Sequence, residues 1–169
     1  GYKNLCYSEG FDDYCAARVR LYTDAGGDLV AEVHSAAAEV GQGVVNIIGQ
    51  VARTELPEIA DVVIAPHTTA AVGSAGSSSA SRQTWMTAGA VRAACLAVRD
   101  ELERRGGTLA PGEEIDEERV YRHRETSPLD PETGQITTGP AHVAFACAAM
   151  KVVVEVDIEL GLTRVVWIG

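Results

Sequence analysis

The sequence predicts an α+β fold in two layers, a mostly antiparallel sheet with two main helices packed on it. Hydrophobic residues alternate with polar ones near both ends of the chain, and between these ends they recur twice at helical spacing. The 169 residues are 46% hydrophobic but only 5% aromatic, so small and β-branched side chains must fill the core. We expect one unit over residues 1–169, with lobes 1–107 and 108–169 as an alternative division.

The first third of the chain predicts a β-hairpin and a helix. Hydrophobic and polar residues alternate over residues 17–34, on both sides of a turn that begins at Gly26. Small residues at 35–43 lead into a helix that ends before Pro57. Its hydrophobic positions share one face, namely Val44, Val45, Ile47, Ile48, Val51, Ala52 and Leu56.

The middle third predicts a short buried strand and a longer helix. The strand covers residues 61–66, and a loop rich in glycine and serine follows at 73–81. The helix runs from about residue 81 to residue 105, where Gly106 stops it. Its hydrophobic positions recur every three or four residues and are Trp85, Ala88, Val91, Cys95, Val98 and Leu102.

The last third predicts a return to β structure. Residues 111–118 are acidic and are expected to form an exposed, solvated surface. Residues 127–134 have the proline, aspartate and glycine content of an irregular, turn-rich connection. Residues 143–157 predict one long strand, and residues 163–168 pair back on it.

Charge and cysteine usage exclude several classes of protein. With 24 acidic and 14 basic side chains the net charge is -10, which repels nucleic-acid backbones. No signal peptide is evident, and the longest uncharged stretch, residues 62–81, is interrupted by proline and glycine. The four cysteines form no C-x-x-C pair, so we expect reduced thiols, two or three of them buried. We therefore expect a cytoplasmic protein without nucleic-acid or membrane partners.

Two loops of small residues that precede a helix are the candidates for ligand binding. They are residues 39–43, Glu-Val-Gly-Gln-Gly, and residues 73–81. Glycine lets a backbone approach a ligand, free N–H groups at a helix start attract anions, and serine hydroxyls add donors. Together the loops predict a clamp for a phosphate-bearing or other oxygen-rich anion; plain helix caps are the alternative. Neither loop is a nucleotide-binding fingerprint.

The remaining polar residues predict structural roles. The histidines share no metal-ligand spacing, so we expect no metal site; they are His34, His67, His123 and His142. Glu39 is expected to cap or pair rather than to act as a base, and Trp85 is expected in the core. Arg82 directly follows the serine-rich loop and either forms a salt bridge or contacts a ligand phosphate.

Four segments, in order, resemble one enzyme family. Residues 39–43 resemble the E-x-G-Q-G segment of the xanthine dehydrogenase and aldehyde oxidase family of molybdenum hydroxylases, and residues 76–84 resemble its G-S-x-x-A-S-R loop. Residues 128–157 are similar to its P-L-D-x-x-T-G … F-A … V-E-V-D stretch, and residues 1–17 to the start of its cofactor-binding region. The molybdopterin-binding subunit of bacterial xanthine dehydrogenases is the nearest likeness.

The resemblance implies a molybdopterin-binding domain of an oxidoreductase that hydroxylates purines with oxygen from water. It implies iron–sulfur and FAD groups on other domains or subunits, and it makes those subunits, the remainder of the molybdenum subunit and a purine substrate the partners. The implied cofactor-binding residues are Gly41, Gln42 and Gly43 in the first loop and Ser77, Ser78, Ser79, Ala80 and Ser81 in the second. Gln42 falls at the family's glutamine near the molybdenum, and the serines fall at the pterin and its phosphate.

Two family segments do not occur in these residues. The catalytic glutamate of the family lies in a G-x-G-E segment near the subunit's C-terminus, and a G-G-x-F-G loop lies upstream; neither is present here. We therefore expect a fragment that is inactive alone, with no catalytic residue, and with exposed hydrophobic surface that favours a homodimer. An aldehyde or carbon monoxide dehydrogenase-type molybdenum subunit and a non-catalytic α+β assembly module are the alternatives.

Overall fold

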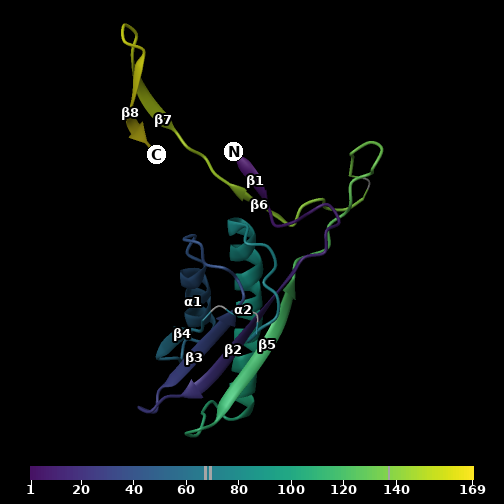
Figure 1. Ribbon diagram of the computed structural model, residues 1–169, viewed down its shortest axis with the longest axis vertical. Helices are drawn as coiled ribbons and strands as arrows, with labels where there is room; N and C mark the ends of the chain where they lie inside the picture. The colour runs from purple at the N-terminus through teal and green to yellow at the C-terminus, as the bar shows by residue number, and fades with distance from the viewer. Residues whose placement is uncertain (67, 69, 137) are drawn as a thin grey trace.

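A sheet backed by two helices forms the core of the protein, as the computed structural model in Figure 1 shows. The structure describes residues 1–66, 68, 70–136 and 138–169. Within them, both helices pack on one face of the sheet and against each other, which confirms the predicted two-layer α+β class. The sheet order is β4-β3-β2-β5, and the elements are β2 (Tyr14–Thr23), β3 (Leu29–Ser35), α1 (Val44–Glu55), β4 (Asp61–Ile64), α2 (Ala80–Arg104) and β5 (Glu114–Arg122).

The strand pairing sets the direction of both helices. β2 and β3 form the predicted antiparallel hairpin, from Ala17 opposite Ser35 to Thr23 opposite Leu29. β3 and β4 are parallel, so α1 is the crossover helix between them. α1 follows the carboxyl end of β3 and α2 follows that of β4, so both helices begin at the same end of the sheet.

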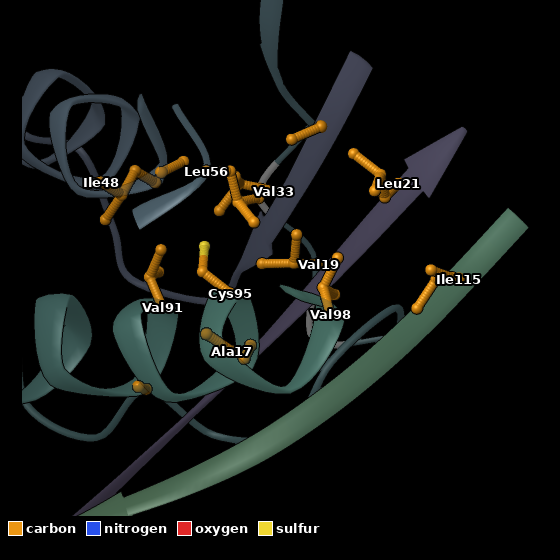
Figure 2. Packing of buried hydrophobic residues seen from close by; sticks show 14 of the residues in the cluster. Ala17, Val19, Leu21, Val33, Ile48, Leu56, Val91, Cys95, Val98 and Ile115 are labelled. Carbon is orange, nitrogen blue, oxygen red and sulfur yellow. The ribbon is translucent and has the colours of Figure 1, made fainter. Parts of the chain in front are cut away.

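The core is built from small side chains, as the composition predicts. Alternate residues of β2, from Cys15 to Leu21, are fully buried against the helices. Figure 2 shows Val19 and Val33 of the sheet facing α2, where Val91, Cys95 and Val98 project toward them. These short side chains let helix and sheet approach closely, so the scarcity of aromatic residues is compatible with a dense core.

The opposite face of the sheet carries ion pairs, and the acidic stretch at 111–118 is exposed as expected except at Ile115 and the half-buried Glu117, although the sequence did not predict that it forms a strand. Most of that stretch belongs to β5, which is antiparallel to β2 and places Ile115 in the core. Arg18 and Arg20 of β2 pair with Asp116 and Glu114 across the strands. These arginines lie about a hundred residues away in sequence, so the sequence around β5 shows the acidic residues without their partners. β5 lies after residue 107, yet it completes the sheet of the N-terminal part.

The expected single strand over residues 143–157 is wrong, because the chain changes partners within it. β6 (Ala144–Cys147) pairs with β1 (Tyr2–Leu5), a strand that the sequence did not predict. β7 (Val152–Asp157) pairs with β8 (Leu162–Ile168), which confirms the predicted C-terminal hairpin. The two pairs end where Ala148 N–H donates to the Gly1 carbonyl and Lys151 N–H donates to the Gly169 carbonyl. In Figure 1 the β7–β8 hairpin extends away from the core, and all its residues are exposed.

Two further expectations about burial need correction. β4 is a half-exposed edge strand rather than a buried one, because only β3 pairs with it. Trp85 is 39% exposed instead of lying in the core, since it sits on the side of α2 turned away from the sheet. Of the cysteines, Cys15 and Cys95 are buried, which confirms that prediction, and desolvation raises the pKa of Cys95 to about 12.

The remaining expectations concern metals and membranes. Among the described residues, no group of three or more His, Cys, Asp and Glu side chains is arranged to hold a metal ion. His34 Nε2 lies 2.6 Å from a Glu32 carboxylate oxygen, and His67 lies outside the described residues. In the described part of the chain, neither helix is long and apolar enough to cross a membrane.

Candidate functional site

The two candidate loops lie at the same end of the sheet. Residues 36–43 connect β3 to α1, and residues 65–79 connect β4 to α2. Because β3 and β4 are parallel neighbours, both connections leave the sheet at its carboxyl end (Figure 1). Ligands of sheets with parallel strands bind preferentially at this end. A shared end of the sheet is the first condition for a clamp formed by both loops; the second is a cavity that both of them line.

The first loop is closed by its own glutamate. One carboxylate oxygen of Glu39 accepts N–H bonds from Gly41 at 2.8 Å and Gly43 at 3.1 Å, and the other accepts one from Val45 at 3.1 Å. Glu39 therefore acts as the cap of α1, as the sequence indicates, and its negative charge lies at the helix N-terminus. An anionic ligand would meet a carboxylate at this position rather than free N–H groups.

Gln42 folds back onto the same loop. Its Oε1 accepts an N–H bond from Val40 at 2.6 Å, and its Nε2 donates to the Ala38 carbonyl at 2.7 Å. One N–H of the amide therefore remains for an external acceptor. Gly41 and Gly43 have φ angles of 98° and 82°, so this tight loop needs glycine at both positions.

Glu39 gives the fold a pH dependence that can be measured. The N–H groups of Val45 and Gly43 hold the pKa of Glu39 below its ordinary value of 4.5. A lowered folded-state pKa means that the carboxylate stabilises the fold above the unfolded-state pKa, and that this stabilisation is lost as the pH falls through the folded-state pKa. We expect Glu39→Gln to lower Tm at pH 7, and we expect its Tm difference from the wild-type chain to shrink as the pH falls below 4.5, measured by thermal unfolding. Glu58→Gln, an exposed glutamate after α1, is the control, and a Tm difference that does not change with pH would contradict the prediction.

The second loop is open at the corresponding place. Ser79 is the N-cap residue of α2, but its side chain makes no capping bond, and the first turn of the helix contains no acidic residue. Ser77, Ser78, Ser79, Ala80 and Ser81 are all exposed. Within the described part of the chain, none of the four serine hydroxyls has a hydrogen-bond partner. The first N–H groups of a helix have no partner inside the helix, so this end of α2 presents free donors.

The buried side chain of Arg82 binds the backbone of this loop. Its guanidinium is 1% exposed and donates from Nε and Nη2 to the two carboxylate oxygens of Asp13, at 2.7 and 2.6 Å. Nη1 donates to the carbonyls of Ala75 and Ser77 at 2.8 and 2.7 Å, and Nη2 donates to that of Tyr14 at 3.1 Å. All five N–H groups of the side chain are thus used by described residues. The choice that the sequence left for Arg82 is decided: it forms a buried salt bridge and shapes the serine loop.

A cavity of about 480 Å³ lies beside the second loop. The rings of Tyr7 and Phe11, with centroids 4.8 Å apart, form part of its wall, and Arg82 stacks over Tyr7 at 5.9 Å. The lining residues are Tyr7, Phe11, Asp12, Asp13, Tyr14, Ser74, Gly76 and Ser77. The first loop contributes none of them, so the two loops share an end of the sheet but not this cavity.

Sequence reasoning missed Asp13 and Gln83 as parts of this site. Asp13 lies 69 positions before Arg82, just ahead of β2, and the resemblance of residues 1–17 to the family gives it no role. Gln83 is 1% exposed and donates to the Ser77 carbonyl at 2.9 Å. The available signal was its place beside Arg82 at the start of a helix, since adjacent polar residues on the buried side of a helix need partners.

Solved structures similar to this chain are larger proteins. The aldehyde oxidoreductase from Desulfovibrio gigas matches 99% of this chain with a TM-score of 0.56 and 23% identity, and the match covers 19% of that protein. The aldehyde oxidoreductase from Desulfovibrio desulfuricans matches 99% of this chain with a TM-score of 0.59 and 17% identity, again over 19% of its length. At these identities the likeness shows the fold, and the chain spans about a fifth of either protein.

Sequence comparison identifies the family. No curated protein matches the chain. The family model of the molybdopterin cofactor-binding domain matches residues 2–168, almost the whole chain. The match includes the capped first loop, the open serine loop and both strand pairs outside the core. This chain therefore belongs to the molybdopterin cofactor-binding domain family.

Proposed function

We propose that this domain binds its molybdopterin cofactor mainly through the second loop. The observation that supports this most directly is the uncapped start of α2, where four unpaired serine hydroxyls accompany free N–H groups. A phosphate group of the cofactor would accept hydrogen bonds there, with Ser77, Ser78, Ser79 and Ser81 as donors and Ala80 contributing its N–H. The overall charge of -10 does not oppose this, because binding depends on the local donors and the helix dipole.

In this proposal the first loop does not bind the phosphate of the cofactor. The carboxylate of Glu39 disfavours a phosphate beside it, so Gly41 and Gly43 shape the loop rather than hold an anion. The free N–H of Gln42 would donate to an uncharged or oxo oxygen of the cofactor. Two loops at one end of the sheet would then contact different parts of one extended ligand.

The activity of the whole protein is part of the same proposal. The molybdenum of the bound cofactor would supply the transfer of water-derived oxygen to a substrate carbon, and electrons would leave through iron–sulfur and flavin groups on other domains or subunits. The similar solved structures are aldehyde oxidoreductases, which supports an aldehyde as substrate. A purine, as in xanthine dehydrogenase, is the second candidate, carried by the sequence resemblance. Assays of the complete enzyme with xanthine and with an aromatic aldehyde would separate the two.

Cofactor binding is tested on the chain expressed in a host that synthesises molybdopterin. We expect the purified chain to carry pterin, measured by the fluorescence of its oxidised form, and to lose most of it on the double substitution Ser77→Ala and Ser79→Ala. Thr108→Ala removes an exposed hydroxyl beyond the other end of α2 and should leave pterin content unchanged. A wild-type chain without pterin would refute cofactor binding, and a serine variant with full content would refute the assignment to this loop.

A further inference from the structure

We propose that Gln83 is a positioning residue of the cofactor site, holding the serine loop through a buried chain of hydrogen bonds that begins at Cys15. The inference rests on the proposed function, because it concerns the loop to which that function assigns the phosphate. The sequence resemblance gives no role to Cys15, and it does not include Thr87. The observations that carry it are burial and hydrogen-bond geometry.

The chain of bonds runs from the sheet to the loop inside the protein. Gln83, Thr87 and Cys15 are all at most 1% exposed. The Thr87 hydroxyl is hydrogen-bonded to Gln83 Oε1, and Cys15 Sγ lies 3.4 Å from Thr87 Oγ1. Gln83 Nε2 donates to the Ser77 carbonyl at 2.9 Å. Three side chains from β2 and α2 thus connect the sheet to one peptide group of the serine loop.

The direction of each bond follows from what each group can donate. Gln83 Oε1 can only accept, so the Thr87 hydroxyl donates its hydrogen to this oxygen. Thr87 Oγ1 can then only accept, so its contact with Cys15 Sγ needs the single thiol hydrogen, for which the Ala16 carbonyl at 3.6 Å is the other acceptor. Desolvation is the main cause that raises the pKa of Cys15, and it keeps the thiol protonated for this bond. The directions are therefore set from Thr87 through Gln83 to the Ser77 carbonyl.

The chain of hydrogen bonds ends at the Ser77 carbonyl, in the loop that is proposed to bind the phosphate. The Ser77 carbonyl accepts from both Gln83 Nε2 and Arg82 Nη1, so it is fixed on the inner side of the loop. The Ser77 side chain lies on the exposed side. Hydrophobic side chains at 83 and 87 would fill the same space, so the polar ones serve orientation rather than packing. Without Gln83, Arg82 alone would hold the carbonyl, and residues 77–79 would sample more conformations.

The test measures loop mobility and pterin retention in the same chain. Gln83→Met keeps the length of the side chain but removes both hydrogen bonds, and Thr87→Val removes the hydroxyl that orients the amide. We expect Gln83→Met to speed amide hydrogen exchange at residues 77–81 by about tenfold in the cofactor-free chain, the effect of losing one net hydrogen bond. Pterin should dissociate faster by a similar factor, and Thr87→Val should change both rates in the same direction by less.

Three controls separate this role from a general loss of stability. Thr87→Ser keeps the hydroxyl and should restore both rates, and Thr108→Ala removes an exposed hydroxyl beyond the other end of α2 and should change neither. The double variant of Gln83→Met and Thr87→Val should resemble Gln83→Met alone, because both residues act through one chain. A lower Tm with unchanged exchange at 77–81 and unchanged pterin dissociation would overturn the inference. A wild-type chain without pterin would instead refute the proposed function, and with it the cofactor part of this inference, whatever the exchange rates are.

Discussion

Replacing Arg82 by alanine is expected to lower the free energy of unfolding by about 3–5 kcal/mol, the usual effect of breaking a buried ion pair. Asp13 would stay buried without its cation, and the carbonyls of Ala75 and Ser77 would lose their shared donor. Arg82→Lys should recover little, since one ammonium cannot reproduce five donors in a plane. Urea unfolding followed by circular dichroism measures the change.

The matched control for Arg82 is an arginine in an exposed ion pair. Arg53 pairs with Asp61 at 2.8 Å, and the two side chains are 53% and 63% exposed. Water screens such a pair, so Arg53→Ala should change stability only slightly. Equal losses for Arg82→Ala and Arg53→Ala would show that burial of the Arg82 pair does not matter. At a urea concentration where both variants are folded, only the Arg82 variant should lose pterin.

Gly76→Ala is expected to have the second-largest effect, because it strains the backbone and displaces Arg82. Gly76 has φ of 68°, and a Cβ atom there would collide with the Arg82 guanidinium. A left-handed alanine costs about 1–2 kcal/mol, and overpacking a tight site adds about 1–3 kcal/mol. We expect the free energy of unfolding to fall by the sum of both effects, and pterin content to fall with it.

Gly27→Ala isolates the backbone part of this effect. Gly27 also has a positive φ, 91°, but a Cβ atom there would have no neighbour within 4 Å. It lies in the turn between β2 and β3, away from the candidate site. The difference between the two alanine variants therefore reports the collision with Arg82. If both variants lose the same stability, the guanidinium moves aside freely, and the rigid loop support inferred above is wrong.

Elements with a local hydrophobic period could be predicted from the sequence. The β2–β3 hairpin and the two helices each present one buried face, and that face repeats within a window of 10 to 25 residues. β5 escaped prediction because its acidic residues are balanced by arginines on another strand. The break between β6 and β7 escaped because their partners, β1 and β8, are near the two ends of the chain.

The candidate site also has features that the sequence predicts and features that only the fold decides. The two small-residue loops could be predicted from the sequence, because glycine and serine next to a helix start indicate close backbone approach and free hydrogen-bond donors. Whether a ligand can reach these loops could not be predicted from the sequence, since it depends on whether a side chain already binds the N–H groups at each helix start. Glu39 fills the first, four residues before Gly43, while the second has no such carboxylate and stays open.

The sequence by itself determined the α+β class, the hairpin, both helices and the two loops, because each follows from the chemistry of neighbouring residues. Only the tertiary structure decided that both loops lie at one end of the sheet, that Arg82 pairs with Asp13, and that Gln83 reaches the Ser77 carbonyl. The physical reason is that a buried polar group must find partners, and those partners are chosen by how strands and helices pack rather than by distance along the chain.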